Sequence, residues 1–167
     1  MDEIAERLEE VAGLQTVRRI GDVHHISLGV YDDVSVEQFV DELQRFAETV
    51  VPIPIRLAMI GVFPGARSVL YLGPVVTEEL LALHRRYHAA LAGFAQSCWE
   101  HYRREHWVPH VTLALEIEPE ALEEAVAAAR KHWAPHDARL DAMRFIRFRP
   151  VETLYLRALS NSRRNAT

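Results

Sequence analysis

Two short stretches of the chain follow the same pattern, and this repetition limits the possible folds more than any other feature. The first motif is His25-Ile26-Ser27-Leu28 and the second motif is His110-Val111-Thr112-Leu113, so each has a histidine, an apolar residue, a hydroxyl residue and a leucine. Along an extended strand, successive side chains point to opposite faces. We therefore predict strands over residues 24–31 and 110–115, each with its histidine and hydroxyl on one face.

The regions that follow the two motifs also correspond in order. Each motif precedes an amphipathic helical pattern, at residues 36–50 and 121–132, and each helical pattern ends near a proline. An Arg-Leu pair and a strand–turn–strand pattern come next in both halves. A shared order of this kind is typical of an internal duplication.

The spacing between equivalent residues supports the duplication. The motif histidines are 85 residues apart, Arg56 and Arg139 are 83 apart, and Tyr71 and Tyr155 are 84 apart. Nearly constant offsets over three residue types indicate that the order of elements was copied together with its spacing.

A duplicated strand–helix–hairpin unit predicts an α+β fold, with one domain over residues 1–167 and pseudo-repeats at about 14–75 and 105–160. Each repeat would form a mostly antiparallel sheet with helices on its outer side. A pseudo-twofold axis would make the two sheets face a central groove in a bilobal molecule, with the motif residues lining that groove. Additional helices are expected over residues 2–11, after Thr77 and over residues 94–104.

The composition excludes several classes of protein. The formal net charge of −5 argues against a broad nucleic-acid-binding surface. Cys98 is the only cysteine, so an internal disulfide is excluded and a reducing, cytoplasmic location is expected. The sequence has no apolar run of about 18 residues, so no membrane span is expected. The acidic start, Met1-Asp2-Glu3-Ile4, lacks the apolar core of a signal peptide.

Two histidines that flank one substrate favour acid–base chemistry. Histidine both accepts and donates a proton near neutral pH, so one of His25 and His110 can activate water while the other protonates the leaving oxygen. Phosphodiester cleavage also needs hydrogen-bond donors to the non-bridging oxygens, and Ser27 and Thr112 are placed to supply them. This scheme requires no metal ion and no other cofactor.

Three aromatic residues are candidates for substrate binding. Tyr71 and Tyr155 alternate with leucines, so they either face the groove and stack on a base or are ordinary surface tyrosines. Trp107 precedes the second motif by three residues, and it either walls the pocket or packs as a partly buried side chain.

The paired motifs resemble those of the 2H phosphoesterases, also called the 2′-5′ RNA ligase-like superfamily. The stretch from Gly61-Val62-Phe63-Pro64 to Val69-Leu70-Tyr71-Leu72 is similar as well, and the similarity covers the chain from about residue 14. The resemblance implies metal-independent hydrolysis or transesterification of 2′,3′-cyclic phosphates or 2′-5′ phosphodiesters, with both motif histidines catalytic and both hydroxyls on the phosphate. It also implies a phosphorylated nucleotide or RNA end as the partner, and we expect a monomer.

The sequence differs from the family pattern at two places, and it leaves two other functions open. Ser27 replaces the commoner threonine, and an acidic helical segment precedes the first motif. One alternative is a non-catalytic protein that binds nucleotides or RNA ends. In the other, His84 and His88 bind zinc, because their i,i+4 spacing on a helix suits a metal, although Arg85 stands where the metalloprotease pattern has glutamate. Chelators would inhibit only the zinc enzyme.

Overall fold

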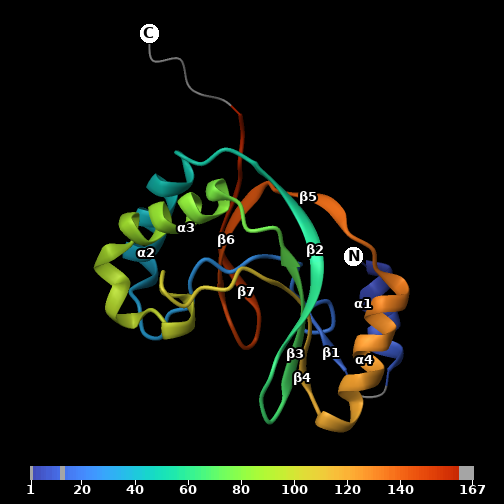
Figure 1. Ribbon diagram of the computed structural model, residues 1–167. Helices are drawn as coiled ribbons and strands as arrows, with labels where there is room; N and C mark the ends of the chain where they lie inside the picture. Colours follow the sequence, from blue (N-terminus) through green and yellow to red (C-terminus); the bar gives the residue numbers. More distant parts are fainter. Residues whose placement is uncertain (1, 12–13, 162–167) are drawn as a thin grey trace. The chain divides into compact units, whose positions relative to one another are not determined.

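The structure is a computed structural model that describes residues 2–11 and 14–161 (Figure 1). Its contacts divide the chain into two compact units, and each unit is assembled from three separate segments. Unit 1 comprises the described residues up to Ile26, together with Arg56–Val75 and Pro109–Ala138. Unit 2 comprises Ser27–Ile55, Val76–Val108 and the described residues from Arg139 onward.

Unit 1 is built around a five-stranded sheet with neighbouring strands paired in the order β1-β4-β3-β2-β5. These strands are β1 (Gln15–Thr16), β4 (Val111–Ile117), β3 (Ser68–Pro74), β2 (Ile53–Phe63) and β5 (His136–Leu140). The pairs β1–β4, β3–β4 and β2–β3 are antiparallel. Strand β2 begins in unit 2 and β5 ends there, so the chain passes between the units along both strands.

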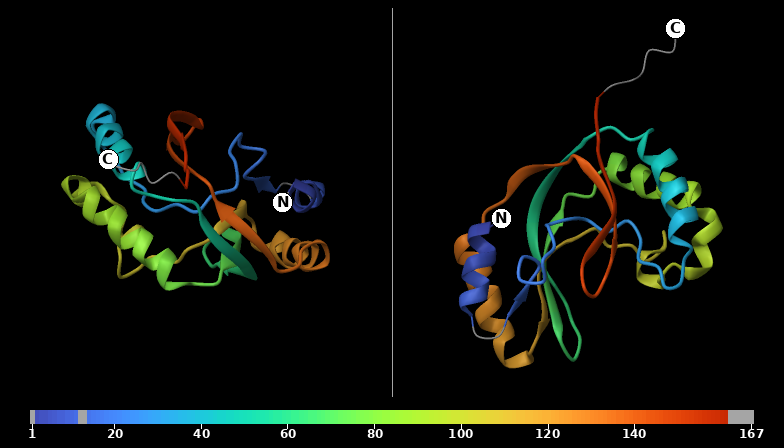
Figure 2. Two further views of the ribbon diagram at one scale, coloured as in Figure 1. Left: turned by 90° about the horizontal axis from the view of Figure 1, so that it is seen from above. Right: turned by 180° about the vertical axis from the view of Figure 1, so that it is seen from behind.

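Two helices cover one face of this sheet. Helices α1 (Asp2–Glu10) and α4 (Pro119–His132) contact each other and lie side by side in every view (Figures 1 and 2). Alternate residues of β3 and β4 are buried on the covered face, namely Leu70, Leu72, Val111 and Leu113. Side chains alternate along a strand, so the residues between these buried ones lie on the other face of the sheet. Their side chains are only half-buried.

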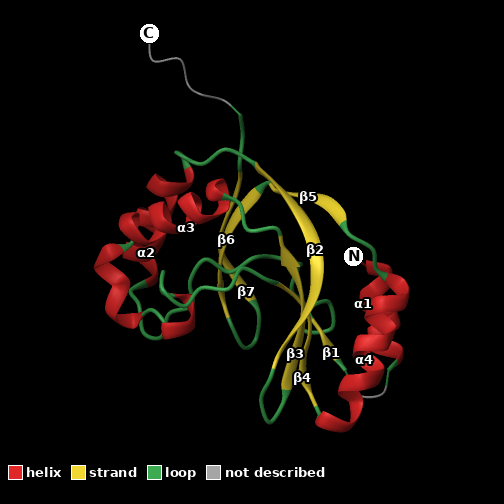
Figure 3. Cartoon of the chain, viewed as in Figure 1, coloured by secondary structure: helices red, strands yellow, loops and turns green. Residues whose placement is uncertain are grey.

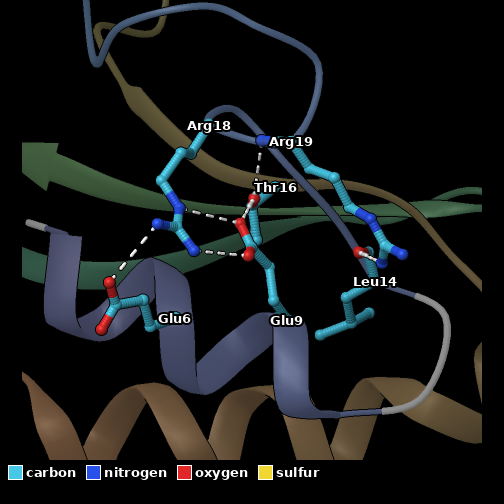
Figure 4. A network of polar contacts seen from close by, with 6 residues as sticks. All are labelled: Glu6, Glu9, Leu14, Thr16, Arg18 and Arg19. Atoms are coloured by element: carbon cyan, nitrogen blue, oxygen red, sulfur yellow. Dashed lines mark hydrogen bonds and ion pairs between the residues drawn. The ribbon is translucent and has the colours of Figure 1, made fainter.

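A polar network joins α1 to the segment that follows β1 (Figure 4). Thr16 is fully buried, and its hydroxyl donates a hydrogen bond to the Glu9 carboxylate and accepts one from the Arg19 backbone N–H. The Arg18 guanidinium binds both Glu9 oxygens, and Nη2 lies 2.7 Å from Oε2. Nη1 of the same guanidinium lies 3.3 Å from Oε1 of Glu6. The acidic residues of α1 therefore bind the segment that follows β1.

Unit 2 contains helices α2 (Val36–Ala47) and α3 (Glu78–Ala90), which contact each other, and the hairpin of β6 (Ala142–Arg147) and β7 (Glu152–Ala158) (Figure 3). Helix α2 buries one stripe of apolar side chains, Phe39, Leu43, Phe46 and Ala47. Phe39 stacks on Phe145 of β6 with ring centroids 4.4 Å apart. Two short 3-10 turns, η1 (Ala92–Ser97) and η2 (Glu100–Tyr102), follow α3.

The predicted α+β class with two antiparallel sheets is confirmed, and the predicted helices near residues 2–11, 36–50 and 121–132 are present. The strand predicted over residues 24–31 was wrong. Only Ile26 and Tyr31 form isolated β-bridges there, to Val111 and to Cys98. The two bridging partners belong to different parts of the chain, so no continuous ladder forms.

The helix predicted over residues 94–104 was also wrong, since the chain forms the turns η1 and η2 instead. Trp99 N–H donates to Val30 O at 2.8 Å, and Ser97 O accepts from Asp32 N–H at 3.0 Å. Backbone groups engaged in this pairing are not available for a helical ladder. Tertiary contacts therefore override the local helical pattern.

The predicted pseudo-repeats at about 14–75 and 105–160 remain a prediction about the symmetry of the sequence. Each structural unit combines segments from both of them. Across residues 2–11 and 14–161, no helix has the length and apolar character needed to cross a membrane.

Candidate functional site

The imidazole of His25 is held through one of its two ring nitrogens. His25 Nδ1–H donates a hydrogen bond to the carbonyl oxygen of Val23 at 2.8 Å, and Oδ2 of Asp22 lies 3.5 Å from the same nitrogen. The Asp22 side chain is only 2% exposed, whereas that of His25 is 39% exposed. A carbonyl oxygen accepts but cannot donate, so Nδ1 carries the hydrogen and Nε2 of the neutral ring keeps a lone pair.

The two motifs meet at the antiparallel bridge between Ile26 and Val111. In this register His25 lies opposite Thr112, and Val111 is buried on the face that the helices cover. His25, His110 and Thr112 therefore share the other face of unit 1. In such a register the two histidines are diagonal neighbours, for which a separation of about 7–8 Å is usual.

The duplication had suggested that the histidines belong to separate lobes, but both belong to unit 1. The boundary between the units falls directly after Ile26, so Ser27 belongs to unit 2. Unit 1 thus brings together four of the predicted site residues, His25, His110, Thr112 and Tyr71.

Tyr71 continues this row across the sheet, because it pairs with Thr112 on β4 and with Gly61 on β2. The Tyr71 ring stacks on the Phe63 ring with centroids 4.3 Å apart. The His110 ring packs edge-on against the Phe63 ring, with centroids 4.8 Å apart. A Cβ atom at Gly61 would lie 2.3 Å from Cζ of Tyr71. The aromatic cluster of Phe63, Tyr71 and His110 therefore requires glycine at position 61.

Ser27 and Trp107 are in contact within unit 2. The indole Nε1–H of Trp107 donates to the backbone carbonyl of Ser27 at 2.9 Å, and the indole ring stacks on His84 with centroids 3.9 Å apart and planes at 6°. Trp107 thus packs as a half-buried side chain with its polar atom engaged. The role in substrate binding predicted for Trp107 and Ser27 stays a prediction.

His84 and His88 form a pair on α3, with their Nε2 atoms 3.1 Å apart. Burial, reinforced by the nearby His88, lowers the pKa of His84 to about 4, and burial also lowers the pKa of His88. Within the described ranges no group of three or more His, Cys, Asp and Glu side chains is arranged to hold a metal ion. The zinc alternative therefore lacks a third side-chain ligand.

Tyr155 pairs with Phe145 across the β6–β7 hairpin of unit 2. Its hydroxyl is buried, and the described residues offer it no hydrogen-bond partner. The predicted contact of Tyr155 with substrate stays a prediction.

The family model of the 2′-5′ RNA ligase superfamily matches residues 2–152. The chain belongs to this superfamily. The resemblance to the 2H phosphoesterases inferred from the two motifs is therefore confirmed. A comparison with curated proteins gave no match.

Solved structures share the fold of this superfamily member. A crystal structure of a phosphoesterase is 17% identical with a TM-score of 0.61, and the match covers 96% of this chain and 93% of that chain. Escherichia coli LigT complexed with 3′-AMP is 18% identical with a TM-score of 0.60, and the match covers 95% and 92% of the two chains. LigT complexed with NADP+ is 17% identical with a TM-score of 0.57, covering 96% and 92%.

Several residues around the superfamily motifs were missed by sequence reasoning. Asp22, which lies beside His25, gave no signal other than its closeness in sequence. Gly61 and Phe63 were noticed only as part of a similar stretch, although a glycine within an apolar strand often marks a close approach. Tyr102 was assigned to the helix that was wrongly predicted over residues 94–104, so its contact with His84 was not foreseen.

Proposed function

We propose that the protein is a phosphoesterase that cleaves 2′,3′-cyclic phosphates or 2′-5′ phosphodiesters, with His25 and His110 as the proton-transfer pair. The observation that carries this proposal is the placement of both motif histidines on one face of unit 1, with Nε2 of His25 left as an acceptor. Membership of the 2′-5′ RNA ligase superfamily supports the class of reaction.

The proposed reaction needs two proton transfers. His25 Nε2 takes a proton from water as the water oxygen attacks phosphorus, and protonated His110 gives a proton to the ribose oxygen that leaves. The P–O bond to water forms as the P–O bond to the ribose breaks, and charge is conserved because one histidine gains the proton that the other loses. Exchange with solvent restores both protonation states.

Hydroxyl groups would bind the phosphate during this step. Thr112 shares the face of His25 and His110, and Ser27 follows the bridged Ile26 in the chain. Hydrogen bonds from such donors to the non-bridging oxygens stabilise the charge that develops in the transition state. Tyr71, next to His110, would stack on the base of a nucleotide substrate.

The class of substrate is supported by the fold relatives. The LigT structures hold 3′-AMP and NADP+, which are both phosphorylated nucleotides. The formal charge of −5 favours a small substrate over long RNA in this chain.

The test is turnover of a panel of 2′,3′-cyclic nucleotides and short 2′-5′-linked oligonucleotides in EDTA. We expect His25→Ala and His110→Ala each to lower kcat/KM by roughly a hundredfold or more. His136→Ala is a matched control, since His136 Nδ1 also donates to the carbonyl two residues earlier, at 3.1 Å. It should keep wild-type activity.

Two results would contradict the proposal. If EDTA abolished the activity, the reaction would depend on a metal ion and the proposed metal-free mechanism would be wrong. An absence of turnover across the panel, with nucleotide binding retained in both histidine variants, would leave the non-catalytic binding protein as the function.

A further inference from the structure

Ser27 lies in a segment that is not held by a β-ladder. Residues 27–30 belong to no strand, and the bridges at Ile26 and Tyr31 flank them. A phosphate-binding hydroxyl must be fixed within about 0.5 Å to be effective. Other groups must therefore hold this segment if Ser27 has the proposed role.

Ring N–H groups hold the backbone carbonyls of this segment. Trp107 Nε1–H donates to Ser27 O at 2.9 Å, and His88 Nε2–H donates to Leu28 O at 3.1 Å. His88 of α3 and Trp107, which precedes the second motif, thus supply the hydrogen-bond donors that a neighbouring strand would otherwise provide.

A second set of contacts fixes these donors in turn. His84 is 2% exposed and stacks on the Trp107 indole. Its Nε2–H donates to Tyr102 O at 3.1 Å. Burial raises the pKa of the Tyr102 phenol, and a hydrogen bond with the Ser27 side chain opposes this shift. These contacts therefore connect Ser27 through Trp107 and His84 to Tyr102.

We propose that Trp107, His84, His88 and Tyr102 are positioning residues that hold the Ser27 hydroxyl in place for the substrate phosphate. This inference rests on the proposed phosphoesterase function and specifies how the first motif is kept in a productive geometry. Trp107 then acts through Ser27, rather than as a wall of the substrate pocket.

Trp107→Phe is the sharpest variant, because phenylalanine keeps an aromatic ring against His84 but lacks the N–H that binds Ser27 O. Trp99→Phe is the matched control: the Trp99 indole N–H also makes one hydrogen bond in unit 2, to Asp32 Oδ1 at 2.7 Å. Both changes are made in the wild type and in the Ser27→Ala background. The substrate is the best member of the panel, and kcat, KM and thermal midpoint are recorded for each protein.

The expected result is non-additive. Trp107→Phe should lower kcat/KM about three- to tenfold in the wild type, as loss of one hydrogen bond permits, and should have no further effect in the Ser27→Ala background. Trp99→Phe should leave kcat/KM unchanged in both backgrounds. A purely structural role would lower the thermal midpoint without this dependence on Ser27.

A second pair of variants tests the histidines. His88→Gln retains an N–H that can reach Leu28 O, whereas His88→Phe does not. We expect the glutamine variant to keep most of the wild-type kcat/KM and the phenylalanine variant to match Trp107→Phe. Because His88 is only half-buried, both variants are expected to fold.

The outcomes separate this inference from the proposed function. A wild type that turns over no member of the panel would overturn both. A wild type that is active, with an effect of Trp107→Phe that is equal in the two backgrounds or absent from both, would overturn the positioning role alone.

Discussion

Gly61 and Tyr71 are cross-strand partners, and the Tyr71 ring lies where a side chain at position 61 would begin. Gly61→Ala would put Cβ 2.3 Å from Cζ of Tyr71, so the ring must leave its stack on Phe63. We expect the free energy of unfolding to fall by about 1–2 kcal/mol, as overpacking does, and KM for a nucleotide substrate to rise. Chemical denaturation and steady-state kinetics would measure both. Gly93→Ala, where a Cβ would meet nothing within 4 Å, should change neither.

The carboxylate of Asp22 faces the ring that we propose as the base. When His25 accepts a proton, the negative charge 3.5 Å from Nδ1 stabilises the resulting imidazolium. Asp22→Asn removes this charge, so kcat should fall about tenfold in steady-state kinetics. Glu100→Gln is the control, since Glu100 pairs with exposed His106 at 3.7 Å. An unchanged kcat in Asp22→Asn would show that the Val23 carbonyl alone orients His25.

His84 should make the folded state sensitive to acid. Its pKa is about 4 in the folded protein, whereas that of an unfolded histidine is about 6.5. Between these values the unfolded chain binds more protons, so stability rises with pH and is lost as the pH falls from about 6.5 to 4. This contributes on the order of 3 kcal/mol. Denaturant unfolding of His84→Gln should show a smaller loss over this range, whereas His101→Gln, at an exposed site, should follow the wild type.

The network around Glu9 should stabilise unit 1. Hydrogen bonds from Arg18 and then from Thr16 lower the pKa of Glu9, so its contribution is present at neutral pH and disappears as the pH falls below about 4. Glu9→Gln should cost about 1 kcal/mol at pH 7 in thermal unfolding, with the difference closing in acid. Glu10→Gln breaks an exposed ion pair with Arg7 and should cost less than Glu9→Gln. Equal costs would mean that the buried Thr16 contact adds nothing.

The sequence predicted those parts of the fold that depend on local patterning. The apolar stripe of α2 and Pro119 at the first turn of α4 were both visible in the order of residues. The alternation along residues 110–115 also placed His110 and Thr112 on one face. The bridge between Ile26 and Val111, which pairs the two motifs, was not predicted.

The remaining errors arose where distant residues replace local structure. The alternating pattern of residues 24–31 predicts a strand, but carbonyls there bind the side chains of Trp107 and His88 instead of a neighbouring strand. No local signal reveals that a partner 60 or 80 residues away will supply those donors. The same holds for Asp22, whose buried position beside His25 arises only in the folded unit.

The assembly of each unit from three segments has a consequence for synthesis and for dissection. Unit 1 needs residues up to Ala138, so nearly the whole chain must leave the ribosome before its sheet and both covering helices are complete. Cutting the chain between Val75 and Val76 would remove β4 and α4 from unit 1 and β6 and β7 from unit 2. Neither half would then contain a finished core, so the two motifs cannot be studied as separately expressed fragments.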